Sequence, residues 1–241
     1  MSQTETDVVV AAAVDCFDAQ YRERGMRSQR SYPNESLIQF VASRYFGMPL
    51  EQRREIRVLE VGCGTGANLW MMAKEGLQVY GLDSSATAID LAAAHLQRKW
   101  GVSANLQQGS FTDLPFADGY FDAVVDVVSL QHLALDSAKR ALGEIARVLK
   151  PGGGFFSYRL SDHSVMFTRS GQPDRLDAAT LRNIDDPAMP LANNGPIAFW
   201  SPALANLMYD ECGMTLDVVE RVGRTYANGA YVEYLCLTGK R

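Results

Sequence analysis

Apolar residues from position 56 onward fall into short continuous runs, separated by longer stretches in which they recur every three or four positions. The first pattern is typical of buried strands and the second of amphipathic helices. The runs lie at residues 56–61, 77–82, 104–106, 121–128 and 155–160. Strands that alternate with helices of this length favour an α/β fold, in which a parallel sheet is doubly wound with helices on both faces.

Two further apolar runs near the carboxyl-terminal end, at 216–222 and 231–238, follow a helix expected from Ser201, its N-cap, to Glu211. Only eight residues separate the two runs, which is too few for a helical crossover. The two strands should therefore be antiparallel neighbours. Together with the five earlier runs they predict a seven-stranded, mostly parallel sheet with an antiparallel carboxyl-terminal strand pair.

Residues 1–54 and 161–200 depart from this alternation. The first stretch contains a helix expected over residues 8–22, a run of arginines, and a second helix for which Asn34 is the expected N-cap. We interpret it as an amino-terminal helical cap on a domain that spans residues 55–241. The second stretch holds four of the nine prolines and is predicted to be a segment inserted into that domain.

The composition is that of an ordinary globular protein, with 47% hydrophobic and 21% charged residues, and it excludes wholesale disorder. The formal net charge of −5 argues against a phosphate-neutralising surface, so nucleic acid is not expected as a partner. Residues 1–7 are polar and acidic, unlike a secretory signal, and no apolar run approaches the ~20 residues of a membrane span. We therefore expect a cytoplasmic protein without membrane contact.

A glycine-rich turn carries the strongest chemical signal. The first predicted strand ends at Gly62-Cys63-Gly64-Thr65-Gly66, and a helix follows. This arrangement brings backbone without side chains against a ligand, at a helix amino terminus and at the carboxyl edge of the sheet. Asp83 ends the second strand, 17 residues past Gly66, where its carboxylate can accept hydrogen bonds from both hydroxyls of a ribose. The pattern indicates an adenosine-containing ligand.

Two classes of ligand fit this turn, because Gly62, Gly64 and Ala67 also satisfy a loosened dinucleotide pattern. Glu60 argues against a dinucleotide, since its charge repels a pyrophosphate and suits an ammonium or a sulfonium. The chain also contains no Tyr-x-x-x-Lys pair, which the commonest single-domain nicotinamide reductases use. The antiparallel strand pair at the carboxyl-terminal end is foreign to standard dinucleotide folds as well.

Four segments in order resemble the class I S-adenosylmethionine-dependent methyltransferases, of the type that acts on small molecules. They are the glycine turn with Glu60, residues 79–85, residues 109–125, and the Leu149–Gly154 loop. The resemblance covers roughly residues 55–160 in detail, and the carboxyl-terminal tail agrees in topology. It implies a Rossmann-like fold and S-adenosyl-L-methionine as cofactor.

The resemblance also implies roles for matching positions. The backbone at Gly62 to Gly64 would lie under the methionine portion, Asp83 would hold the ribose, and Ser84 would flank the adenine. Ser110 and Phe111 occupy the adenine-edge position, where the family usually has an aspartate in place of Ser110. The full set of expected cofactor-binding residues is Glu60, Gly62, Cys63, Gly64, Gly66, Asp83, Ser84, Ser110, Phe111 and Asp126.

The histidines are the candidate general bases for methyl transfer to oxygen. His95 is expected at the surface, and for His132 a structural role is favoured over a catalytic one. His163 follows the fifth strand at the carboxyl edge of the sheet, where α/β folds bind ligands, so it is the predicted catalytic residue. The three histidines are far apart and the four cysteines form no Cys-x-x-Cys pair, so no metal site is expected.

The segment at 161–200 is predicted to lie on the acceptor side. Its aromatic residues Phe167, Phe199 and Trp200 suit an apolar acceptor wall, and a satellite hydrophobic cluster is the alternative. Arginines between positions 22 and 30 could bind an anionic group on the acceptor, although a solvated helix face is favoured for most of them.

The sequence thus predicts a methyltransferase that acts on a small-molecule acceptor by in-line transfer, with a homodimer left open as its oligomeric state. Two alternatives remain. One is a catalytically inert, S-adenosylmethionine-binding regulatory relative, and the other is an NAD-dependent oxidoreductase.

Overall fold

A seven-stranded sheet in the order β3-β2-β1-β4-β5-β9-β8 forms the centre of the computed structural model, which describes residues 3–169, 175–189 and 191–241. The strands β1 to β5 are mutually parallel, and β9 runs antiparallel to β5 and to β8. This confirms the predicted fold class, including the antiparallel pair. The strands are β1 Arg57–Val61, β2 Gln78–Asp83, β3 Asn105–Gln108, β4 Phe121–Val127, β5 Leu149–Leu160, β8 Thr215–Thr225 and β9 Tyr231–Lys240.

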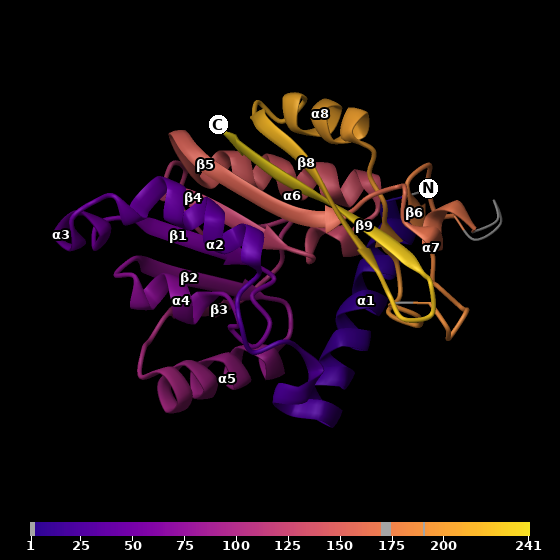
Figure 1. Ribbon diagram of the computed structural model, residues 1–241, viewed down its shortest axis with the longest axis horizontal. Helices are drawn as coiled ribbons and strands as arrows, with labels where there is room; N and C mark the ends of the chain where they lie inside the picture. Colours follow the sequence, from indigo (N-terminus) through magenta and orange to yellow (C-terminus); the bar gives the residue numbers. More distant parts are fainter. Residues whose placement is uncertain (1–2, 170–174, 190) are drawn as a thin grey trace.

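Helices cover both faces of the sheet (Figure 1). Neighbouring residues of β4 show the alternation, because Val124 packs in the hydrophobic cluster with α6 and α8, whereas Ala123 and Val125 pack in the cluster with α2 and α4. The helices are α2 Glu35–Val41, α4 Leu69–Lys74, α5 Ala86–His95, α6 Leu135–Val148 and α8 Pro202–Asp210.

Two expected helix caps are confirmed. The Asn34 side chain accepts a hydrogen bond from the N–H of Leu37 at 3.1 Å, and the Ser201 hydroxyl accepts one from the N–H of Leu204 at 3.0 Å. The remaining short helical pieces are η1 Gly25–Ser28, η2 Ala42–Phe46, α3 Leu50–Arg53, η3 Leu96–Trp100, η4 Leu130–His132 and α7 Val165–Thr168.

The segment at 161–200, of which residues 170–174 and 190 lie outside the described ranges, contributes α7 and a small separate sheet. That sheet pairs β6 Thr180–Leu181 with β7 Ile197–Ala198. Phe199 and Trp200 are fully buried, and Phe199 stacks on Phe167 with 5.2 Å between ring centroids. These aromatic side chains therefore form hydrophobic core, and the expectation that they wall an acceptor site is wrong.

Helix α1, Gln3–Arg24, lies across the carboxyl ends of the parallel strands (Figure 1). The Asp18 carboxylate accepts a hydrogen bond of 2.6 Å from Ser85, which caps α5, and Gln20 donates one of 3.0 Å to Asn194 of the inserted segment. The β8–β9 ribbon extends beyond the sheet toward the same region. Helix α1 thus bridges the sheet and the inserted segment over the edge where α/β folds bind ligands.

His95 is buried, so its expected surface position is wrong. Its Nδ1 lies 3.0 Å from the carbonyl oxygen of Thr65, and Trp100 donates a hydrogen bond to its Nε2 at 3.2 Å. The ring therefore ties α5 to the glycine turn, which is a structural role.

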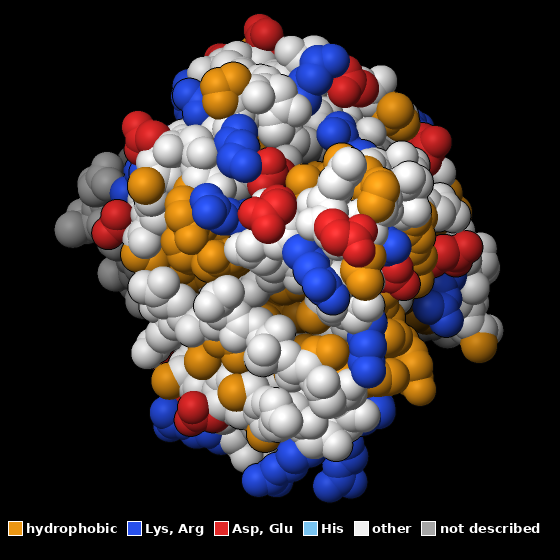
Figure 2. Space-filling view, turned by 90° about the vertical axis from the view of Figure 1, so that its left-hand side faces the viewer, with side chains coloured by type: hydrophobic (Ala, Val, Ile, Leu, Met, Phe, Trp, Pro, Cys, Tyr) orange, Lys and Arg blue, Asp and Glu red, His pale blue; other side chains and the backbone are white. Residues whose placement is uncertain are grey.

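The face at the amino ends of the strands carries interspersed positive and negative side chains (Figure 2). Within the described ranges, no helix is both long and apolar enough to cross a membrane. The same part of the chain contains no group of three or more His, Cys, Asp or Glu residues arranged to hold a metal ion.

Candidate functional site

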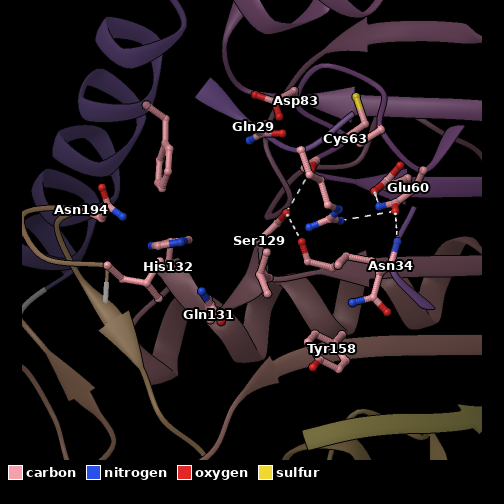
Figure 3. Close-up of a pocket in the computed structure, with 18 of the residues that line it drawn as sticks. Gln29, Asn34, Glu60, Cys63, Asp83, Ser129, Gln131, His132, Tyr158 and Asn194 are labelled. Carbon is pink, nitrogen blue, oxygen red and sulfur yellow. Dashed lines mark hydrogen bonds between the residues drawn. The ribbon is translucent and has the colours of Figure 1, made fainter. Parts of the chain in front are cut away.

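A cavity of about 700 Å³ lies at the carboxyl ends of the strands, and α1 forms part of its wall. Its walls come from α1, the glycine turn, the end of β2, the turn after β4, β5, the inserted segment and the β8–β9 hairpin. Figure 3 shows Asp83, Cys63 and Glu60 toward one end, His132 and Asn194 toward the other, and Ser129 between them. The volume is in the range of small-molecule and cofactor sites.

The glycine turn approaches the turn after β4 without room for a side chain. Gly62 has a positive φ of 68°, and a Cβ added there would collide with the Ser129 hydroxyl. The same hydroxyl donates a hydrogen bond to the Gly62 carbonyl at 3.0 Å, and the N–H groups of Gly62 and Cys63 both donate to the Leu82 carbonyl. The turn is therefore fixed on both sides before any ligand binds.

Asp83 lines the cavity and also holds the two loops beside it. One carboxylate oxygen accepts the N–H of Gly64 at 2.9 Å, and the other accepts the N–H of Ser85 at 3.0 Å. Burial raises the pKa of Asp83, while these backbone bonds oppose the rise. Each oxygen can accept a second hydrogen bond, so the carboxylate retains capacity for two hydroxyl groups.

Glu60 is buried in the cavity wall with one oxygen unsatisfied. Asn68 donates a hydrogen bond to its Oε1, whereas Oε2 has no partner among the described residues. Burial raises the pKa of Glu60 to about 8. Arg30 also lines the cavity and donates to the Asn68 side chain at 3.3 Å. A buried, half-satisfied carboxyl close to a guanidinium matches the ammonium and carboxylate of an amino-acid head group.

The predicted cofactor-binding residues divide into two groups. Those that line the cavity are Glu60, Gly62, Cys63, Asp83, Ser84, Ser110 and Phe111. Gly64, Gly66 and Asp126 are not among the lining residues. Gly64 serves the site indirectly through its bond to Asp83, and Gly66 packs against Ala92 and Leu96 at the end of α5.

Asp126 is fully buried and faces the protein, contrary to its expected place in the cofactor site. Its carboxylate accepts the N–H groups of Ser129 and Leu130 at 2.9 and 3.0 Å, and the Ser157 hydroxyl at 2.6 Å. Burial raises its pKa against these hydrogen bonds. The side chain therefore caps the turn after β4.

That turn contains a strained residue. Val128 has a φ of 59°, which is rare for a β-branched side chain, and its N–H donates to the Tyr158 carbonyl at 2.8 Å. Strain of this kind persists where the surrounding structure enforces it and is concentrated at functional sites. Here the bend directs the chain so that Ser129, Gln131 and His132 line the cavity.

His132 presents a neutral imidazole to the cavity. Its Nδ1 lies 3.0 Å from the carbonyl oxygen of Pro196, which can only accept, so Nδ1 carries the proton and Nε2 has a free lone pair. Burial lowers the pKa of His132 to about 4. Phe17 of α1 packs edge-on against the ring, with 4.7 Å between centroids. This histidine is therefore an available hydrogen-bond acceptor near neutral pH.

His163, the predicted catalytic residue, does not line the cavity. Its Nδ1 lies 3.6 Å from the Glu233 carboxylate and 2.9 Å from a guanidinium nitrogen of Arg221, and about half of the side chain is exposed. The chain after β5 stays bound to β9, since the N–H of Ser161 donates to the Glu233 carbonyl. This pairing holds His163 beside β9 and away from the cavity.

Sequence patterns did not identify the lining residues that come from distant segments. The arginine run pointed to the amino-terminal cap, where Arg30 lines the cavity, whereas Arg22 pairs with Asp18 and is not among the lining residues. No sequence pattern indicated that the β8–β9 hairpin would line the cavity, because the direction of its side chains depends on the twist of the ribbon. The unrecognised aromatic and basic lining residues of β5 and the hairpin are Tyr158, Arg224, Tyr226 and Tyr234.

Comparison with known proteins shows that part of this chain is similar to methyltransferases. Residues 58–153 match the family model described as a methyltransferase domain. Sterol 24-C-methyltransferase erg-4 of Neurospora crassa is 34% identical over 134 residues, which cover 54% of this chain and 35% of that protein. Demethylmenaquinone methyltransferase of Tropheryma whipplei is 38% identical over 96 residues, which cover 40% of this chain and 38% of that protein. The chain thus spans little more than a third of the length of these curated relatives.

Solved structures share the fold over most of the chain. The 1,6-didemethyltoxoflavin-N1-methyltransferase of Burkholderia thailandensis, with 1,6-didemethyltoxoflavin and S-adenosylhomocysteine bound, gives a TM-score of 0.69 at 18% identity. The superposition covers 100% of this chain and 91% of that chain. A methyltransferase of Methanosarcina mazei gives a TM-score of 0.66 at 20% identity, over 77% of this chain and 92% of the other.

Proposed function

We propose that this chain is a class I S-adenosylmethionine-dependent methyltransferase, as its match to the methyltransferase-domain family model over residues 58–153 supports, and that it methylates a small molecule bound in the cavity. The observation that carries the proposal is that a continuous cavity joins the buried carboxyl groups of Glu60 and Asp83 to the aromatic surroundings of His132. The names of the two curated relatives, a sterol and a demethylmenaquinone methyltransferase, support a small-molecule acceptor.

The residues at the glycine-turn end fit S-adenosylmethionine. The half-satisfied Glu60 would receive the ammonium and Arg30 the carboxylate of the methionine portion. The free acceptor capacity of Asp83 would receive the ribose hydroxyls, and Phe111 would pack beside the adenine. When bound, the cofactor supplies a methyl group on a positively charged sulfur, so the leaving group is already activated.

The raised pKa of Glu60 makes its proposed contact with the ammonium group measurable. With a pKa of about 8, about nine-tenths of its carboxyl groups are protonated at pH 7, and an ammonium group beside it lowers that pKa. Binding of S-adenosylhomocysteine, which has the same head group, is therefore expected to release protons at pH 7. Calorimetry in two buffers of different ionisation enthalpy measures the number released.

Glu60→Gln should remove this proton release, whereas Glu75→Gln should retain it. Glu75 pairs with Arg53 and is not among the cavity-lining residues, which makes it a matched control. Release that persists in Glu60→Gln would show that another group meets the ammonium.

At the other end of the cavity, we propose that His132 accepts the proton of a hydroxyl acceptor through Nε2. Its bond to the Pro196 carbonyl fixes the ring in the tautomer that leaves this nitrogen unprotonated. Phe17 and Leu191 provide apolar walls of the cavity on this side. Alignment of the acceptor and exclusion of water are the main requirements of an in-line displacement from an activated leaving group.

The proposal is tested by incubating the chain with S-adenosylmethionine that carries a labelled methyl group, together with an extract of small metabolites. Label should appear in a small-molecule product, and S-adenosylhomocysteine should form in equal amount. An inert binding relative would bind the cofactor in calorimetry and yield neither product. Lack of cofactor binding, with binding of NAD in its place, would overturn the proposal.

A further inference from the structure

We propose that the acceptor is a planar aromatic compound with a carboxylate or similar anionic group, which Arg224 of β8 recognises. This inference rests on the proposed function, because it assigns the acceptor end of the same cavity. It concerns a wall built by β5 and the β8–β9 hairpin, which contributes Arg224, Tyr226, Tyr158 and Tyr234. We call these four residues the hairpin wall.

The distribution of charge in the cavity favours an anion at the hairpin wall. The charged side chains that line the cavity are Glu60, Asp83, Arg30 and Arg224. Glu60 and Asp83 lie at the glycine-turn end, whereas Arg30 lies between that end and the hairpin wall, since it donates to Asn68 and its charge also acts on Tyr158 and Tyr234. The guanidinium of Arg224 packs over the Tyr226 ring, 4.9 Å from its centre, and forms no ion pair with any residue that the structure describes. No carboxylate from the hairpin wall balances its charge.

The phenol groups of the hairpin wall are suited to the same ligand. Burial raises the pKa of Tyr158 to about 12 although Arg30 and Arg224 oppose the rise, and burial also raises that of Tyr234. Both tyrosines are therefore neutral at physiological pH and able to donate hydrogen bonds. A guanidinium with neighbouring hydroxyl donors matches a carboxylate, which accepts charge-assisted hydrogen bonds from both.

Aromatic side chains stand on two sides of the acceptor end. Tyr158 and Tyr234 stack with 4.7 Å between ring centroids and an interplanar angle of 20°. Phe17 and His132 contact each other edge-on and form another part of the wall of the same cavity. Aromatic rings prefer stacked or edge-on contacts with other rings, so these surfaces favour a flat aromatic acceptor over a flexible aliphatic chain.

The hairpin wall is built on regular structure. Arg224 pairs in register with Val232, and Tyr234 pairs with Val222, within the antiparallel β8–β9 ladder. Tyr234 also pairs with Leu160 at the end of β5. Strand pairing fixes the backbone at these positions, so the hairpin wall presents Arg224 and Tyr234 on one face of the ribbon before the acceptor arrives.

The test uses the full chain saturated with S-adenosylhomocysteine and two matched probes, 3-hydroxy-2-naphthoate and its neutral amide, 3-hydroxy-2-naphthamide. Calorimetry should show that the acid binds at least about tenfold more tightly than the amide, as expected for a charge-assisted contact. Arg224→Gln should remove this preference, and Arg224→Lys should retain part of it.

Arg221→Gln is the matched control, because Arg221 lies on the same strand but outside the residues that line the cavity. It should retain the full preference for the acid. Equal affinity for the two probes, no binding of the acid, or a preference that survives in Arg224→Gln would each overturn the inference.

A separate titration with S-adenosylhomocysteine distinguishes this inference from the proposed function. If the wild-type chain does not bind S-adenosylhomocysteine, the proposed function fails. If it binds S-adenosylhomocysteine normally and shows no preference for the acid, only the assignment of the acceptor fails. Unchanged S-adenosylhomocysteine affinity in Arg224→Gln shows that this variant is folded.

Discussion

Replacing His132 with glutamine is expected to lower kcat by roughly a hundredfold or more, which is the usual contribution of a positioned general base. The affinity for S-adenosylhomocysteine should stay within about twofold, because His132 lies toward the other end of the cavity from Glu60 and Asp83. A glutamine amide has no basic nitrogen, so it cannot accept the proton that the Nε2 lone pair of His132 would take. Steady-state kinetics with an identified acceptor, together with calorimetry, measures both quantities.

His163→Gln is the control for this experiment, because sequence position alone favours His163 as the base. Its side chain faces Glu233 and Arg221 outside the cavity-lining residues, so kcat should not change. Loss of turnover in His163→Gln with full turnover in His132→Gln would overturn the assignment of His132.

The pH dependence gives a further check on His132. Its pKa is about 4 in the folded chain, so turnover should not change between pH 6 and 8 through this group and should fall as the ring gains a proton near pH 4. The ordinary pKa of 6.5 applies in the unfolded chain, which therefore binds this proton more tightly. The stabilising contribution is present above pH 6.5 and is lost as the pH falls toward 4. Thermal unfolding across this range separates loss of fold from loss of activity.

Much of the fold could be predicted from the sequence because local patterns determine it. Continuous apolar runs identified the strands, and the eight residues between the last two strands required an antiparallel connection. His95 shows the limit of such reasoning. Its helical position near Arg98 and Lys99 indicated solvent, whereas its burial depends on contacts with Thr65 and Trp100 that form only when the fold is complete.

The site could be predicted only where its residues are close together in sequence. Gly62 and Asp83 end adjacent strands, so strand order alone brings them together. Asp126 also lies near the end of a parallel strand, but its carboxylate accepts hydrogen bonds from the N–H groups of Ser129 and Leu130 in the turn after β4. Arg30 and Arg224 come from segments that lie far apart in the chain and meet around the cavity through tertiary packing.

Asp83→Ala is expected to weaken binding of S-adenosylhomocysteine by at least about 3 kcal/mol, or more than a hundredfold. The carboxylate would lose its hydrogen bonds to the ribose hydroxyls, and each bond to a charged group contributes about 1.5–3 kcal/mol. The variant should also be less stable by about 1–3 kcal/mol, because the buried N–H groups of Gly64 and Ser85 lose their acceptor. Calorimetry and denaturant unfolding measure the two effects separately.

Asp122→Ala separates a binding role from a structural one. The Asp122 carboxylate also accepts a backbone N–H, that of Arg57 at 2.9 Å, and pairs with Lys150, at the opposite end of the sheet from the cavity. Its loss should lower the free energy of unfolding by a similar amount and leave the affinity for S-adenosylhomocysteine unchanged. If both variants weaken binding equally, the effect arises from stability alone and Asp83 does not hold the ribose. A selective loss of affinity in Asp83→Ala requires a direct contact, because the two carboxylates make comparable bonds to the backbone.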